Sequence, residues 1–169
     1  MAMIGGAVAQ FPAGWLADKF DRRHVLIGAS LLSVLVCGAT ALSTDVSPGG
    51  AMLMSFLFGV ATIPIFSISA AHANDFADAD FMAELSADLM FFYGVGAIFS
   101  PLLASALIQA YGPGAMFGMI AVAHVGLVVF GLYRMTVRDA RTKAPYTYIP
   151  RTSFILGRVL RRRDARKNR

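Results

Sequence analysis

The segment MLMSFLFGVATIPIFSI, residues 52–68, contains no charged side chain and is apolar or weakly polar on every face of a helix. A helix on the surface of a soluble protein needs a polar face that recurs about every 3.6 residues. Residues 31–41 lack such a face as well. Lipid or other transmembrane helices must therefore surround these segments, which argues against a soluble all-helical core.

Most of the chain is similarly apolar and consists of five runs with few charged residues. They cover residues 1–17, 24–44, 50–71, 85–110 and 113–133, with Asp88 as the only charge inside them. A helix needs roughly 20 mostly apolar residues to cross about 30 Å of hydrocarbon. We predict an all-α polytopic membrane protein, with about five transmembrane helices in residues 1–134 and a basic cytoplasmic tail in residues 135–169.

The composition also separates the chain from soluble proteins. Of its 169 residues, 57% are hydrophobic and 15% are charged, against about 45–50% and about 25% in soluble domains. Lys19, Arg22 and Arg23 are the basic residues of the first 133 positions, and the other twelve of the fifteen follow. No folded polar domain carries a basic stripe, so the expected partner is an anionic membrane surface and not nucleic acid.

Nothing in the residue pattern predicts an enzyme. Cys37 is the only cysteine, so it can form neither an internal disulfide nor a zinc site. No glycine loop is arranged to hold a phosphate, and we expect no cofactor and no metal. The acidic segment from His72 to Asp80 lacks the glycine and closing glutamate of a calcium loop, and we interpret it as solvated.

The basic residues predict the orientation of the chain, because Lys and Arg accumulate on the cytoplasmic side. The turn at residues 18–23 and the tail are basic, whereas the turns at residues 45–49 and 111–113 contain no Lys or Arg. Five spans place both basic segments on one side and the N-terminus outside. We therefore predict a multi-pass protein of the plasma membrane, the inner membrane of a bacterium, with a cytoplasmic C-terminus.

The tail contains a candidate surface helix. Within residues 152–163, Ile155 with Val159 and Leu156 with Leu160 form an apolar strip beside several arginines. This pattern is typical of a short helix that lies on the inner leaflet of the membrane.

The turn between the first two runs reads GWLADKFDRR, residues 14–23. It resembles the signature loop of the major facilitator superfamily, G-x-L-a-D-[RK]-x-G-R-[RK]. Asp21 departs from the motif, because the family has glycine at this position. This difference puts the tightness of the turn in question. Seven of the eight specified positions agree: Gly14, Leu16, Ala17, Asp18, Lys19, Arg22 and Arg23.

The residues of this turn have a physical use that can be stated without the family. Gly14 lets a neighbouring helix approach closely. Asp18 can pair with Arg22 or Arg23, or lie against the positive N-terminus of an adjacent helix. A charge cluster that packs in one state and opens in another biases a two-state equilibrium. The resemblance implies a conformational-gating motif that closes the cytoplasmic side, made of Gly14, Leu16, Asp18, Lys19, Arg22 and Arg23.

Two further segments resemble the same family. Residues 93–101, YGVGAIFSP, are similar to the glycines and following proline of the family's penultimate helix, and residues 72–75, HAND, resemble the corresponding loop of bacterial transporters of the YcaD type. The five runs would then be helices eight to twelve of a twelve-helix scheme. The resemblance implies secondary transport of a small solute by alternating access, with protons as a candidate coupling ion.

In that scheme the N-terminal half of the transporter is missing. We therefore expect a fragment that does not transport as a monomer. Two alternatives stay open: a membrane-embedded scaffold or interaction protein with the tail as its working part, and a half-transporter that dimerises to replace the missing half. The charged turn favours the transporter and the dimer, because a membrane anchor needs no such turn.

Several residues inside the runs are candidates for packing or for a transport path. Gln10 can face a substrate cavity or bond a neighbouring helix. Asp88 can carry a proton, or lie in the first turn of its helix and interact with the helix dipole. His124 can serve a proton path or form a structural hydrogen bond. We favour the structural interpretation for Asp88 and His124. The candidates for helix packing or kinks are Pro64, Gly94, Gly96, Pro101, Gly114 and Gly118.

Overall fold

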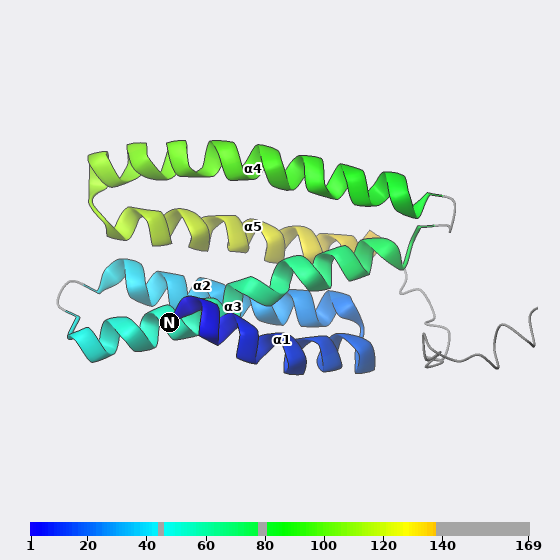
Figure 1. Cartoon of the computed structure of the whole chain (residues 1–169), viewed down its shortest axis with the longest axis horizontal. Coiled ribbons are helices and arrows are strands. Elements are labelled where there is room, and N and C mark those ends of the chain that lie inside the picture. The colour runs from blue at the N-terminus through cyan, green and yellow to red at the C-terminus, as the bar shows by residue number, and fades with distance from the viewer. Residues whose placement is uncertain (44–45, 78–80, 138–169) are drawn as a thin grey trace, which may run out of the picture. The chain divides into compact units, whose positions relative to one another are not determined.

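The computed structural model describes residues 1–43, 46–77 and 81–137. These residues form α1 (Ala2–Lys19), α2 (Arg22–Leu42), α3 (Pro48–Asn74), α4 (Met82–Tyr111) and α5 (Gly114–Val137), as Figure 1 shows. They contain no strand, so the all-α prediction is confirmed. The predicted surface helix of the tail lies outside the described residues, as do Asp78 and Asp80.

Four of these helices, α2 to α5, are long and apolar enough to cross a membrane. The 18-residue α1 is not among them. Its sequence is interrupted by Gln10 and Pro12 and ends with Asp18 and Lys19, which lowers its apolar character. One side of α1 packs along α3.

Most of the residues that the helices bury are small, although Val36, Ile65, Ile68 and Val128 are also buried, and many large apolar residues are exposed. The buried residues include Ala9, Ser33, Cys37 and Ala61, whereas the side chain of Phe11 is 84% exposed. In lipid, helices gain little by hiding large apolar side chains, so close contact through small residues drives their packing. This distribution is the reverse of a soluble core and fits an apolar surrounding.

The closest helix approach lies between α1 and α3. A side chain at Gly59 would collide with the backbone carbonyl of Ala2, and one at Gly5 would collide with the carbonyl of Phe56. Gly114 is similarly placed, because a Cβ there would lie 2.6 Å from the carbonyl oxygen of Ala41. Gly114 was predicted from the sequence as a packing position, whereas Gly5 and Gly59 were not.

Local sequence explains where the helices begin and end. The carboxylate of Asp21 accepts a hydrogen bond of 3.0 Å from the backbone N–H of Arg23 and caps α2. The hydroxyl of Ser47 accepts one of 3.2 Å from the N–H of Gly50 and caps α3. Gly112 ends α4 with φ of 88°, a conformation that favours glycine.

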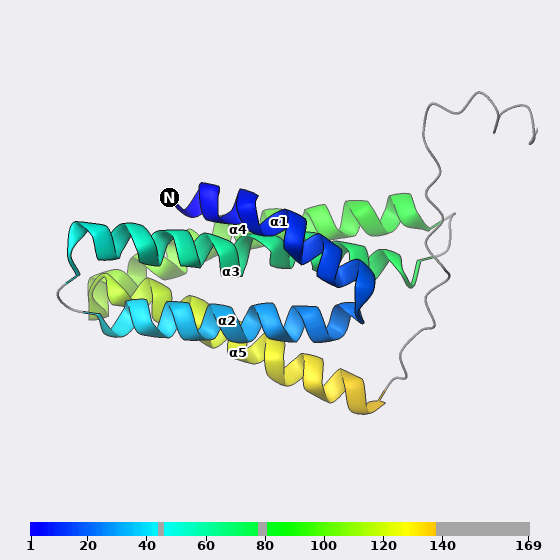
Figure 2. The same cartoon turned by 90° about the horizontal axis from the view of Figure 1, so that it is seen from below.

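The chain direction brings the charged residues to one end of the bundle. The helices α1, α3 and α5 end there, and α2 and α4 begin there, at the right of Figure 1. We call this the charged end, and it is defined by Asp18, Lys19, Arg22, Arg23, Asp75 and Arg134. At the opposite end α2 and α4 end and α3 and α5 begin, which both views show (Figures 1 and 2).

Candidate functional site

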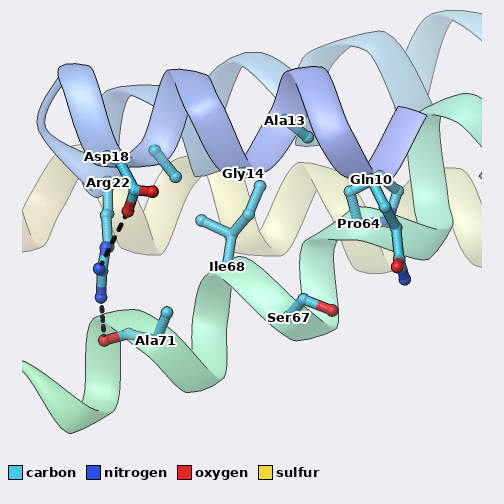
Figure 3. Close-up of a pocket in the computed structure, with 10 residues that line it drawn as sticks. Gln10, Ala13, Gly14, Asp18, Arg22, Pro64, Ser67, Ile68 and Ala71 are labelled. Carbon is cyan, nitrogen blue, oxygen red and sulfur yellow. Dashed lines mark hydrogen bonds and ion pairs between the residues drawn. The ribbon is translucent and has the colours of Figure 1, made fainter. Parts of the chain in front are cut away.

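Arg22, the first residue of α2, connects three helices at the charged end. Its Nη1 donates a hydrogen bond of 2.9 Å to Oδ1 of Asp75 and another to the backbone carbonyl of Ala71. Its Nη2 lies 3.6 Å from Oδ1 of Asp18. Asp18 belongs to α1, whereas Ala71 and Asp75 lie at the end of α3. Figure 3 shows the guanidinium between the carboxylate of Asp18 and the last turns of α3.

The contacts to α3 are stronger than the contact to α1. The side chain of Arg22 is 17% exposed and that of Asp75 is 33% exposed, whereas that of Asp18 is 67% exposed. A shorter ion pair in a drier position is screened less by water and salt. A cation at the end of α3 also interacts favourably with the helix dipole. Arg22 therefore binds the beginning of α2 to the end of α3 and holds Asp18 more loosely.

Two buried polar atoms at this site have no hydrogen-bond partner among the described residues. They are Nε of Arg22 and Oδ1 of Asn74. Buried polar atoms are normally paired, and leaving one unpaired costs about 1–3 kcal/mol.

The other residues of the predicted gating motif take different positions. Lys19 lies over the ring of Trp15, with Nζ 4.8 Å from the ring centroid. Arg23 lies over the ring of Phe76, with its guanidinium carbon 5.9 Å from the centroid. The backbone carbonyl of Leu16 accepts a 2.8 Å hydrogen bond from the N–H of Phe20 as α1 ends.

The departure at Asp21 is explained by its backbone and its cap. Asp21 has φ of −62° and ψ of 124°, so this turn needs no residue with positive φ. Its carboxylate caps α2 instead, which a glycine cannot do. Around Gly14, no heavy atom of the described helices lies within 4 Å of an added Cβ. A close approach at Gly14 would thus need a partner from outside these helices.

A groove runs from Arg22 along the interface of α1 and α3. Its volume is about 140 Å³. Gln10, at the far end from Arg22, lies near Pro64, as Figure 3 shows. The structure thus brings together three residues that the sequence analysis considered separately, namely Gln10, Asp18 and Pro64. The groove is lined from α1 and the start of α2 by Gln10, Ala13, Gly14, Ala17, Asp18 and Arg22, and from α3 by Pro64, Ser67, Ile68 and Ala71.

Asp88 and His124 lie away from this groove. The expectation that Asp88 occupies the first turn of its helix is wrong, because α4 begins at Met82 and its first-turn acid is Glu84. Asp88 is exposed, about one turn further along. Nδ1 of His124 lies 2.8 Å from the carbonyl oxygen of Ile120, one turn earlier in α5. This bond stays within one helix and does not join two helices.

The remaining packing and kink candidates lie in continuous helices. Pro64 and Pro101 are inside α3 and α4, which continue through them. Within the described residues, no heavy atom lies within 4 Å of an added Cβ at Gly94, Gly96 or Gly118. Their predicted packing role would therefore require a neighbour other than these five helices.

Asp75 is the site residue that the sequence analysis missed. It was grouped with a solvated acidic segment, yet it pairs with Arg22 at 2.9 Å. A usable signal was present, since the predicted topology already placed the start of the second run and the end of the third run on the same side. The predicted topology did not indicate how each helix is rotated about its own axis.

Comparison with known proteins adds the family context. The model of the family described as Major Facilitator Superfamily matches residues 1–166. "Uncharacterized MFS-type transporter YcaD" of Escherichia fergusonii is 29% identical over 145 residues, which are 85% of this chain and 35% of that protein. The protein of the same name in Salmonella paratyphi B is 30% identical over 145 residues, with 85% and 35% covered.

A third relative gives the same picture. "Uncharacterized MFS-type transporter" of Yersinia pestis strain Pestoides F is 29% identical over 151 residues, covering 88% of this chain and 37% of that protein. The chain thus matches little more than a third of the length of each of these relatives. No solved structure matches it.

Proposed function

Because this chain belongs to the major facilitator superfamily, we propose that it supplies helices eight to twelve of a secondary transporter that moves a small solute by alternating access. It is a multi-pass membrane protein of a transport family and not an enzyme. The match covers 35% of the relative from Escherichia fergusonii, so the helices described here make up only part of the proposed transporter.

The contacts of Arg22 are the observation that supports this proposal best. Arg22 holds the beginning of α2 against the end of α3, while Asp18 keeps a mostly exposed carboxylate. That carboxylate is placed to accept hydrogen bonds from the N-terminus of a helix in another half. The proposed role of the charged end is to close the cytoplasmic side in one state and to open in the other.

The helix α4 offers a surface for the missing half. None of its described residues is buried, and the aromatic side chains of Phe91 and Phe92 are 67% and 70% exposed. Gly94 and Gly96 leave open space on the same helix, where another helix can approach closely. The proposed partner is an N-terminal half, and a second copy of this chain is the alternative.

The proposed orientation predicts a labelling pattern. In a Cys37→Ser background, single cysteines are placed at Phe20, Val46 and Asn168. We expect a membrane-impermeant maleimide to label Val46→Cys in intact cells, and to label Phe20→Cys and Asn168→Cys only after permeabilisation, because Lys and Arg are retained on the cytoplasmic side. Labelling of positions 20 and 168 from opposite sides would contradict the topology.

The proposal also predicts that this chain alone does not transport. More than half of the helices that enclose a midplane substrate site would be absent. Proteoliposomes containing the chain, tested with radiolabelled sugars, amino acids and organic cations, should show no saturable, uncoupler-sensitive uptake above empty vesicles. Saturable uptake would favour the dimer, and crosslinking of a single Ile98→Cys variant on α4 would then locate its interface.

A further inference from the structure

A second cavity, of about 500 Å³, lies between α2, α3 and α5 at the charged end. Its lining residues recur every three or four positions, as in residues 23, 26, 27 and 30 of α2 and residues 127, 130, 131 and 134 of α5. Such spacing is one face of a helix. Seven residues of α2 correspond to a depth of roughly 10 Å. In Figure 2, α5 diverges from α2 toward this end.

The mouth of this cavity is cationic. Arg23 of α2 and Arg134 of α5 are the residues nearest the helix ends on their two walls. The guanidinium carbon of each lies 5.9 Å from an aromatic ring that also lines the cavity, Phe76 for Arg23 and Phe130 for Arg134. An aromatic ring at this distance attracts the cation weakly, and the N–H groups of a guanidinium match the geometry of phosphate oxygens.

The deeper part of the cavity is apolar. Leu26, Ile27 and Leu127 line it about one to two turns beyond the arginines. None of the described residues that line it is acidic. Among the described acids at this end, Asp21 caps α2 and Asp75 accepts a hydrogen bond from Arg22.

We propose that this cavity binds an anionic phospholipid, with its phosphate between Arg23 and Arg134 and one acyl chain along Leu26, Ile27 and Leu127. Arg23 and Arg134 line the cavity where the apolar helices α2 and α5 begin and end, which is the level of the headgroups. Its volume suits a headgroup and the first part of an acyl chain. A soluble anion would leave the apolar depth in contact with water, and this lipid site is separate from the groove beside Arg22 and does not depend on transport.

The test measures lipid retention by the whole chain in detergent. Delipidated protein is incubated with equal amounts of phosphatidylglycerol and phosphatidylcholine of identical acyl chains, and bound lipid is counted by native mass spectrometry. We expect phosphatidylglycerol to be retained at least about ten-fold better, because a basic residue near an anionic headgroup contributes about five-fold. Arg23→Gln and Arg134→Gln should each lower that preference about five-fold.

Three controls distinguish this site from nonspecific attraction to positive charge and from a site for soluble anions. Lys19→Gln removes the same charge at the same end without touching the cavity and should change the preference less than about two-fold. Ala73→Phe leaves every charge in place but fills the cavity, and should lower retention of both lipids. Excess glycerol 3-phosphate, which has no acyl chain, should not displace bound lipid.

Several results would overturn the proposal. One is equal retention of the two lipids, and another is a loss of the phosphatidylglycerol preference in Lys19→Gln as large as in the arginine variants. Displacement of bound lipid by glycerol 3-phosphate would indicate a site for soluble anions. If Arg23→Gln does not give a monodisperse protein, the exposed Arg134 decides the result by itself, and Arg134→Lys should keep most of the preference.

Discussion

Replacing Gly59 with leucine should separate α1 from α3 and prevent recovery of a folded protein. The backbone of α1 lies so close to Gly59 that even a Cβ would collide with the carbonyl of Ala2. No change of rotamer can relieve a collision with backbone, so the helices must move apart. We expect the free energy of unfolding to fall by about 3 kcal/mol or more, which is the upper end of the range for volume added to a packed interface. The measurement is the fraction of monodisperse protein in detergent and its melting temperature.

The same substitution at Gly28 provides the matched control. Gly28 lies in α2, is exposed, and has no heavy atom of the described residues within 4 Å of an added Cβ. Leucine there removes a weak helix former and should leave stability unchanged or slightly higher. Equal melting of the Gly59→Leu and Gly28→Leu proteins would show that the close approach of α1 and α3 does not exist.

The second large effect is expected from removing Arg22. Arg22→Met retains much of the length of the side chain but removes the guanidinium that donates to the carboxylate of Asp75 and to the carbonyl of Ala71. Asp75 is 33% exposed, so water restores part of the lost interaction. We expect a loss of about 1–3 kcal/mol in the free energy of unfolding, the range for a half-buried charged hydrogen bond.

Double-mutant cycles can identify which carboxylate Arg22 pairs with. The cycle of Arg22→Met with Asp75→Asn should give a coupling of about 1–2 kcal/mol. The cycle with Asp18→Asn should give less than about 0.5 kcal/mol, because that pair is 3.6 Å apart and Asp18 is 67% exposed. Raising the salt concentration should weaken the Asp18 coupling first. A larger coupling to Asp18 would contradict the arrangement at the charged end.

These predictions concern features that the sequence revealed to different degrees. The turn at residues 14–23 was recognisable because its charges interrupt apolar runs at a particular spacing. The ion pair of Arg22 with Asp75 was not recognisable, because the two residues are 53 positions apart. Nothing in the residue pattern favours Asp75 over Asp18 as the partner. The tertiary structure gives the preference a physical basis, because the end of α3 lies beside the start of α2.

The amino-acid sequence by itself determined the class of this protein: a set of apolar helices for a membrane, with one charged turn. It could do so because hydrocarbon leaves each backbone group only its own helix as a partner, and length and apolarity are local properties. Only the tertiary structure decided which helix faces meet, at Gly5, Gly59 and Arg22. Helices that are apolar on all sides carry no polar stripe to show which face turns inward, so contact between backbones and a few polar atoms makes that choice.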